Sequence, residues 1–213
     1  MDLPIIRTTM TTMTTTTTTT TTTTKILVLD NYDSFTYNLV HILKELTHRE
    51  TVEVFRNDRI SLDEVDRFDK IVLSPGPGIP DEAGILKSLI ARYGASKSIL
   101  GVCLGCQAIA EVYGGRLINL DRVYHGVATP VTLLDPNDRT FRGLNGSIEA
   151  GRYHSWVVDP SCVPPELVVS ASDTEGHIMA LYHKTYDVRG VQFHPESVLT
   201  PDGKQMIKNF LNF

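Results

Sequence analysis

The chain has 213 residues, a formal net charge of -5 at pH 7 and 41% apolar residues, enough for one compact domain with a sizeable core. No block of Lys and Arg is present, which argues against a nucleic-acid surface, and no apolar run is long enough to cross a membrane. Three cysteines without framework spacing favour a reducing, cytoplasmic compartment over a disulfide-stapled secreted fold.

Residues 1–24 form a threonine-rich segment with no alternating apolar face. Nothing in this segment favours burial, so we expect a disordered tail, followed by a single domain over residues 25–213. The segment also lacks the continuous apolar centre of a secretory signal and the several arginines of a transit peptide. No function is assigned to it.

From Lys25 onward, apolar strands alternate with amphipathic helices. The first strand is expected over Ile26–Leu29, and Ser34 is placed to cap a helix whose apolar residues recur at helical spacing over 35–46. Further strands are expected over Thr51–Phe55, Lys70–Leu73, Ile99–Cys103 and Val188–Phe193, and further helices over Ala83–Tyr93 and Cys106–Tyr113. This alternation predicts an α/β fold with a mainly parallel, open sheet and helices on both faces.

Between Gly114 and Ala180 the helical pattern stops. Short apolar runs predict a small antiparallel β extension there, over Ala128–Leu134, Val157–Val158, Leu167–Ala171 and Met179–Tyr182. Residues 124–126 of this region are expected to form an exposed turn, with a docking surface as the alternative.

In open α/β sheets, ligands bind at the carboxyl ends of the strands. Asn31, Pro75, Cys103 and His194 each follow a predicted strand. We therefore expect these residues to converge on one rim of the sheet.

Cys103 leaves its strand in a turn flanked by Gly101 and Gly105. The small neighbours allow a sharp strand-to-helix turn that holds the sulfur clear of the backbone, as a nucleophile requires. The free N–H groups at the start of the next helix would favour a thiolate and an oxyanion beside it. The alternative is that Cys103 is a small buried hydrophobe.

His194 and Glu196 follow the last predicted strand and are separated by Pro195. Residues two apart on an extended chain point to the same side, so Glu196 can hold the tautomer and tilt of the His194 ring. With Cys103, they complete a nucleophile, a base and an orienting group for covalent catalysis. A purely structural histidine is the alternative.

Residues 74–80 alternate glycine and proline after the third strand of the sheet. Such a stiff loop can turn the N–H groups of Gly76 and Gly78 toward a ligand and form one wall of an oxyanion hole. An ordinary rigid loop is the alternative. A phosphate cradle is disfavoured because neither glycine-rich nucleotide motif is present, and no metal or cofactor is predicted.

Several segments together resemble a known family: Asp30–Leu39, Ser74–Gly78, Gly101–Gly105, Tyr153–Ser155 and Gly190–Ser197. In order and position they resemble the class I glutamine amidotransferases, and most closely the glutaminase subunits (component II) of anthranilate synthase and aminodeoxychorismate synthase. The resemblance implies a flavodoxin-like sheet, L-glutamine as substrate, and a separate chorismate-binding synthase subunit (component I) that uses the ammonia to make anthranilate. Service to aminodeoxychorismate synthesis is the alternative, because chorismate is recognised by the other subunit.

The resemblance also implies roles for individual residues. Cys103 would attack the glutamine amide, His194 would protonate the leaving ammonia and then activate water, and Glu196 would align His194. The glutamine and its oxyanion would be held by backbone and side-chain groups of Gly76, Pro77, Gly78, Leu104, Gln107, Ser155 and Trp156.

Cys106 and Trp156 depart from the family pattern, in which histidine is usual at the first position and leucine is frequent at the second. Cys103 and Cys106 form a C-x-x-C sequence, so a redox exchanger, or oxidative capture of Cys103 by Cys106, is an alternative. A redox exchanger would have no use for His194 and Glu196. A peptidase or γ-glutamyl hydrolase with the same strand-to-helix turn (elbow) at Cys103 and the same base is another alternative. An inactive subunit that only regulates a partner is a further one.

Overall fold

The computed structural model describes residues 23–47 and 51–212, so the threonine-rich segment 1–22, for which we predict a tail, lies outside the described residues. The long sheet contains β1 (Lys25–Asp30), β2 (Thr51–Arg56), β3 (Lys70–Leu73), β4 (Ser98–Val102), β6 (Val127–Leu133), β7 (Ser147–Arg152), β9 (Leu167–Asp173), β10 (Ile178–His183) and β11 (Val188–Val191). A second sheet pairs β5 (Leu117–Asn119) with β8 (Trp156–Val158).

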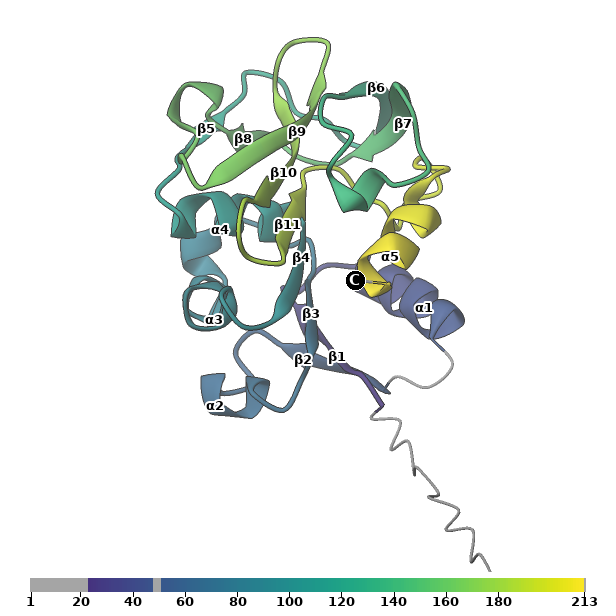
Figure 1. The fold of residues 1–213 in the computed structure, drawn as a ribbon. Coiled ribbons are helices and arrows are strands. Elements are labelled where there is room, and N and C mark those ends of the chain that lie inside the picture. The colour runs from purple at the N-terminus through teal and green to yellow at the C-terminus, as the bar shows by residue number, and fades with distance from the viewer. Residues whose placement is uncertain (1–22, 48–50, 213) are drawn as a thin grey trace, which may run out of the picture.

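The strand order of the long, nine-stranded sheet is β2-β1-β3-β4-β11-β10-β9-β6-β7 (Figure 1). The strands from β2 to β11 in this order pair in parallel, and those from β11 to β7 pair antiparallel. This confirms the predicted mainly parallel sheet with an antiparallel extension. The extension continues the same sheet, so the two regions share a backbone frame.

Helices cover both faces of the parallel part, as predicted (Figure 1). They are α1 (Thr36–Leu46), α2 (Leu62–Val65), α3 (Leu86–Tyr93), α4 (Leu104–Val112) and α5 (Gly203–Leu211). Along β1, Ile26 and Val28 join the apolar cluster under α1 and α5, whereas Leu27 and Leu29 join the cluster under α3 and α4. Successive side chains of a strand point to opposite faces, so a continuous apolar strand supplies both layers of the core.

Three helix starts differ from the sequence-based expectation. Phe35, not Ser34, occupies the N-cap of α1, and its N–H is held by the Asp33 carboxylate at 2.7 Å. α3 begins three residues later than expected, because Gly84 takes a left-handed φ of 53° after a short 3₁₀ turn. α4 begins at Leu104, two residues earlier than expected.

Four elements, α2, α5, β5 and β7, were not expected from the sequence. Over residues 114–180, all of which the structure describes, there is no α-helix, as expected from the loss of helical periodicity. None of the helices within the described ranges combines the length and apolar character needed to cross a membrane.

Candidate active site

Cys103 occupies the turn between β4 and α4, where it is the N-cap residue with φ 52° and ψ −101°. A positive φ is costly for a residue with a side chain, and such strain gathers at functional sites. The turn is tight: a Cβ added to Gly101 would lie 2.5 Å from the carbonyl carbon of Gly105. Both glycines are therefore required by close packing, as predicted for an elbow that presents the sulfur.

The rim predicted from the strand ends is present. β1, β3, β4 and β11 are neighbours in the sheet, so Asn31, Pro75, Cys103 and His194 follow adjacent strands. Pro75, Cys103 and His194 line one cavity of about 440 Å³, and the N–H of Asn31 donates to Ser74 beside them at 2.8 Å. Residues far apart in sequence thus meet at the carboxyl edge of the sheet.

The His194 and Glu196 side chains are 2% and 0% exposed, and Nδ1 of His194 lies 2.8 Å from Oε1 of Glu196. Burial lowers the pKa of His194, but the Cys103 sulfur and the Glu196 carboxylate outweigh burial and raise this pKa above its ordinary value. With Nδ1 held by Glu196, Nε2 is left for the sulfur. Among the described residues, Nε2 has no hydrogen-bond partner of the usual geometry, but the Cys103 sulfur lies close enough to raise the pKa of the ring.

Aromatic rings confine the His194 imidazole. The ring centroids of Phe35 and Tyr153 lie 5.3 and 4.8 Å from that of His194, both near edge-to-face geometry. Such packing restricts rotation of the ring and limits access of water. The imidazole is therefore held in place on two sides as well as through Glu196.

A second cavity, of about 270 Å³, also has Cys103 in its lining. Its lining contains the predicted binding residues Gly76, Pro77, Gly78, Gln107, Ser155 and Trp156. We call it the glutamine cavity, after the substrate that the sequence resemblance implies. Of the predicted set, Leu104 is outside this lining: its side chain is 1% exposed, and a Cβ added to Gly76 would lie 2.6 Å from its Cδ2.

The start of α4 and the Gly76 loop face each other closely because Gly76 has no side chain. An added Cβ there would also lie 2.8 Å from the carbonyl oxygen of Asn31, so no larger residue fits. The N–H groups of the first helical turn, beginning with Leu104, have no partner within the helix. They lie beside Cys103 and can stabilise an oxyanion that forms there.

Two buried amides connect the glutamine cavity to the sulfur. Nε2 of Gln107 donates to the carbonyl oxygen of Trp156 at 2.9 Å and to Oε1 of Gln192 at 3.2 Å. Nε2 of Gln192 then lies 3.6 Å from the Cys103 sulfur. The NH₂ group of Gln107 is thus fully used inside the protein, which leaves its Oε1 as the free hydrogen-bonding atom.

Gln192 was not predicted from the sequence, although a signal was present. It lies two residues before His194, inside the segment Gly190–Ser197 that carries the family resemblance. His154 was missed as well, because its burial beside the cavity depends on the antiparallel extension. It is 6% exposed and lines the glutamine cavity.

Two further expectations are corrected. Tyr124 is not part of an exposed turn: it is 2% exposed and lines the glutamine cavity. Cys106 is 0% exposed and packs against Gly190, and burial raises the pKa of its thiol far above the ordinary value. A thiol held neutral in this way is a poor attacking group, so the C-x-x-C sequence does not form a redox pair of the usual kind.

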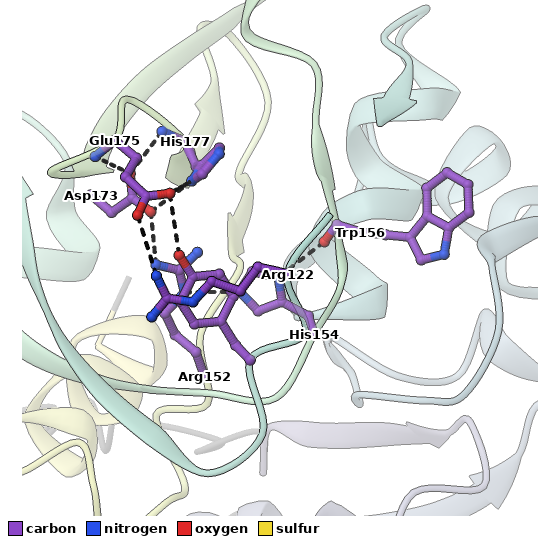
Figure 2. Close-up of polar contacts among 8 residues, drawn as sticks. Arg122, Arg152, His154, Trp156, Asp173, Glu175 and His177 are labelled. Atoms are coloured by element: carbon purple, nitrogen blue, oxygen red, sulfur yellow. Dashed lines mark hydrogen bonds and ion pairs between the residues drawn. The ribbon is translucent and has the colours of Figure 1, made fainter. Parts of the chain in front are cut away.

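Asp173, Glu175 and His177 could offer ligand atoms within 4.8 Å of one another. However, Asp173 is paired with Arg152 and Glu175 with Arg122 (Figure 2). The two positively charged guanidinium groups at these carboxylates disfavour a metal ion there. The arrangement is that of an ion-pair network.

Comparison with known proteins identifies the family of the chain. The profile of the family "Glutamine amidotransferase class-I" matches residues 27–212. Aminodeoxychorismate/anthranilate synthase component 2 of Bacillus subtilis is 45% identical, over 87% of this chain and 95% of that protein. Anthranilate synthase component 2 of Cyanophora paradoxa is 44% identical, over 88% of this chain and 98% of that protein.

The chain also matches part of a longer protein. It is 44% identical to the bifunctional protein TrpGD of Thermotoga maritima but spans only 32% of that protein. Among solved structures, a protein assigned as one of the GMP synthase subunits of Thermoplasma acidophilum aligns with a TM-score of 0.80 at 29% identity, over 90% of this chain and 94% of that one.

Proposed function

Because the chain belongs to the class-I glutamine amidotransferase family and is a glutamine amidotransferase enzyme, we propose that it is the glutaminase subunit of a chorismate-using synthase. It hydrolyses L-glutamine and passes the ammonia to a separate subunit that makes anthranilate. Relatives named as component 2 of anthranilate synthase support the assignment. The observation that carries it is the meeting of three side chains: Cys103 lines the glutamine cavity, Cys103 and His194 both line the cavity of about 440 Å³, and Glu196 holds Nδ1 of His194 at 2.8 Å.

In the proposed reaction, the Cys103 thiolate attacks the side-chain carbonyl carbon of glutamine. The resulting oxyanion is held by the N–H of Leu104 and by N–H groups of the Gly76 loop. Nε2 of His194 gives its proton to the amide nitrogen, the carbon–nitrogen bond breaks, and ammonia leaves a glutamyl thioester on Cys103.

Hydrolysis of the thioester follows. His194, now neutral, takes a proton from water, which attacks the thioester carbon and releases glutamate and the Cys103 thiolate. Glu196 keeps the ring in one tautomer and stabilises its cationic form in both steps. In the glutamine cavity, Oε1 of Gln107 is placed to accept a hydrogen bond from an N–H of the substrate, and the Ser155–Trp156 backbone and Gly78 complete its recognition.

A direct test uses free glutamine and a glutamine-like electrophile, 6-diazo-5-oxo-norleucine. We expect ammonia release and covalent labelling of Cys103, and we expect Cys103→Ser to lose both. Ammonia from a peptide or a γ-glutamyl peptide but not from glutamine would favour another hydrolase. Absence of labelling at Cys103 would favour a subunit that only regulates a partner.

Aminodeoxychorismate synthesis is the second candidate, because one relative carries both names. The chain should be combined with a chorismate-binding subunit of each kind and supplied with glutamine and chorismate. Anthranilate, detected by its fluorescence, supports the first assignment, and aminodeoxychorismate supports the second. We also propose a cytoplasmic setting, on the ground that Cys103, Cys106 and Cys162 are all free thiols.

A further inference from the structure

A buried ion pair supports the extension side of the glutamine cavity. Nη1 of Arg152, the last residue of β7, donates to Oδ2 of Asp173 at 2.7 Å, and the two side chains are 1% and 3% exposed (Figure 2). Burying two charges costs much desolvation energy, and such a pair is weak evidence for added stability. Arg152 does not line the cavity itself. The other contacts of Arg152, with residues that do line the cavity, indicate a role other than stability.

The Nε–H of Arg152 donates to Nε2 of His154 at 3.1 Å. A guanidinium can only donate, so Nε2 of His154 must be unprotonated and Nδ1 must carry the hydrogen. This hydrogen lies toward the carbonyl oxygen of Trp156, with Nδ1 at 3.1 Å (Figure 2). Burial, with a further contribution from Arg152, lowers the pKa of His154 to about 3, so the ring is neutral when the enzyme works.

The carbonyl oxygen of Trp156 therefore receives two hydrogens. One comes from His154 and the other from Nε2 of Gln107, at 2.9 Å. If His154 adopted the other tautomer, the lone pair of Nδ1 would face the carbonyl oxygen and repel it. The Trp156 peptide would then shift, and the Gln107 amide would lose its fixed orientation.

Arg152 also supports a second wall of the cavity. Its guanidinium carbon lies 3.5 Å from the centroid of the Tyr124 ring, and Tyr124 lines the glutamine cavity. Asp173 is itself fixed, because its carboxylate accepts hydrogen bonds from the N–H groups of Glu175 and His177. Asp173 thus fixes the guanidinium of Arg152, which in turn contacts two cavity residues, His154 and Tyr124.

We propose that Arg152, anchored by Asp173, is a positioning residue for glutamine: it fixes the tautomer of His154 and so the Trp156 carbonyl and the Gln107 amide. The inference rests on the proposed glutaminase function. It predicts that loss of Arg152 weakens recognition of glutamine much more than it changes the reactivity of the Cys103 sulfur, which Gln107 reaches only through Gln192.

The test compares two alkylations of Cys103, followed by mass spectrometry of its peptide. Diazo-oxo-norleucine must occupy the glutamine cavity, whereas iodoacetamide needs only the nucleophile. In Arg152→Met we expect the inhibition constant KI for diazo-oxo-norleucine to rise about tenfold and the iodoacetamide rate to stay within about twofold. Arg189→Met is the matched control, because Arg189 is also a buried arginine that pairs with carboxylates, Asp138 and Asp187 at 3.2 Å each, and it lies on β11 instead of β7.

A second measurement reports the tautomer directly. In the ¹⁵N spectrum of wild-type protein, His154 should show a bare Nε2 and a protonated Nδ1, and in Arg152→Met this pattern should be lost. Because Arg152→Met leaves a buried carboxylate unpaired, the double variant R152M/D173N, with R189M/D138N as its control, is used if the single variant does not fold.

Three outcomes overturn the inference. An unchanged KI in a folded Arg152 variant would remove the positioning role, and so would an unchanged tautomer. An equal rise in KI in the Arg189 control would assign the effect to general loosening of the extension. If wild-type Cys103 reacts with iodoacetamide but not with diazo-oxo-norleucine, the glutaminase proposal itself fails, and the positioning role fails with it.

Discussion

Glu196 is a single carboxylate that sets the charge of the proposed base. Its Oε1 accepts from Nδ1 of His194 at 2.8 Å, inside a nearly water-free site. In Glu196→Gln, the negative charge is lost and the amide can turn its NH₂ group toward Nδ1, which favours the wrong tautomer. We expect kcat for glutamine hydrolysis to fall about 10²- to 10⁴-fold, the range that general acid–base catalysis contributes.

The pH profile of the same variant tests whether Glu196 raises the pKa of His194. Cys103 and Glu196 raise the pKa of His194, so in the wild type the cationic form needed to protonate the leaving amide nitrogen is lost only as the pH rises through this elevated value. Without the carboxylate, the alkaline limb of kcat/KM should move to lower pH. An alkaline limb that stays in place would show that Glu196 does not set the charge of His194.

His154 makes a separate prediction about acid stability. Its pKa is about 3 in the folded protein and near 6.5 in the unfolded chain, so the unfolded chain binds the additional proton between these values. Stability should therefore fall as the pH drops from about 6.5 toward 3. Between pH 7 and pH 5, protonation of His154 in the unfolded chain should lower the free energy of unfolding by about 2 kcal/mol, from roughly 1.4 kcal/mol per pH unit.

Urea unfolding at the two pH values checks this. His154→Gln should lose about 2 kcal/mol less than wild type between pH 7 and pH 5. His41→Gln, at an exposed position of α1, should keep the wild-type difference. Equal acid sensitivity in all three proteins would argue against a buried, neutral His154.

The proposed nucleophile and base could be selected from the sequence because each lies in a short segment with a strong local signal. Gly101 and Gly105 flank Cys103 at two residues on either side, and Pro195 separates His194 from Glu196. The supporting residues were not predictable. His154 and Arg152 gain their environment only when β7 and β9 pair with β6, a long-range event that no local pattern encodes.

At the scale of elements, the packing of α4 on β4 sets the position of the sulfur. In Gly101→Ala, the new Cβ would lie 2.5 Å from the backbone of Gly105, so α4 must move away from the strand. We expect a loss of about 1–3 kcal/mol in the free energy of unfolding, as for overpacked cores, and slower alkylation of Cys103.

Urea unfolding and iodoacetamide labelling measure the two effects of Gly101→Ala. Gly176→Asn is the control: Gly176 has a φ of 84° and no neighbour within 4 Å, and asparagine tolerates this conformation. If Gly101→Ala were as stable and reactive as this control, the elbow would not depend on close packing.

The elements that were predicted share strong local signals. β1, β3 and β4 are buried on both faces and appear as continuous apolar runs, which is typical of parallel strands. β7 was missed because its inward residues include a charged one: Ile148, Ala150 and Arg152 alternate toward the interior. α5 carries apolar residues at helical spacing, Met206, Ile207 and Phe210, but it is short and begins at a glycine, which suggests a loop.

At the scale of the whole molecule, the predicted domain begins where the threonine-rich segment ends. The family profile covers residues 27–212, and the pattern of the sequence changes near Lys25. We expect a chain without residues 1–22 to keep the glutaminase rate and the Tm of the full chain, because no apolar face in that segment could join the core. A large loss of either would assign a role to the segment.

The cavity of about 440 Å³ at Cys103 and His194 has consequences for the released ammonia. His194, the proposed proton donor to the leaving amide nitrogen, lines this cavity but not the glutamine cavity, so we expect neutral ammonia to leave on this side. In neutral water it becomes mostly ammonium, which is a poor nucleophile. An acceptor subunit that covers the cavity would keep the ammonia unprotonated until it reacts.

An isotope competition tests this transfer in the complex with the chorismate-binding subunit. Glutamine labelled with ¹⁵N in its amide is supplied with chorismate and an excess of unlabelled ammonium. If the partner covers the cavity, anthranilate should retain most of the ¹⁵N even when ammonium exceeds glutamine, because released ammonia does not mix with the solution. The partner should also speed glutamine hydrolysis, since closure orders the loop at Gly76. If the ¹⁵N content of anthranilate instead falls to that of the ammonium in solution, ammonia escapes from the first subunit. The second subunit would then take its ammonia from the solution.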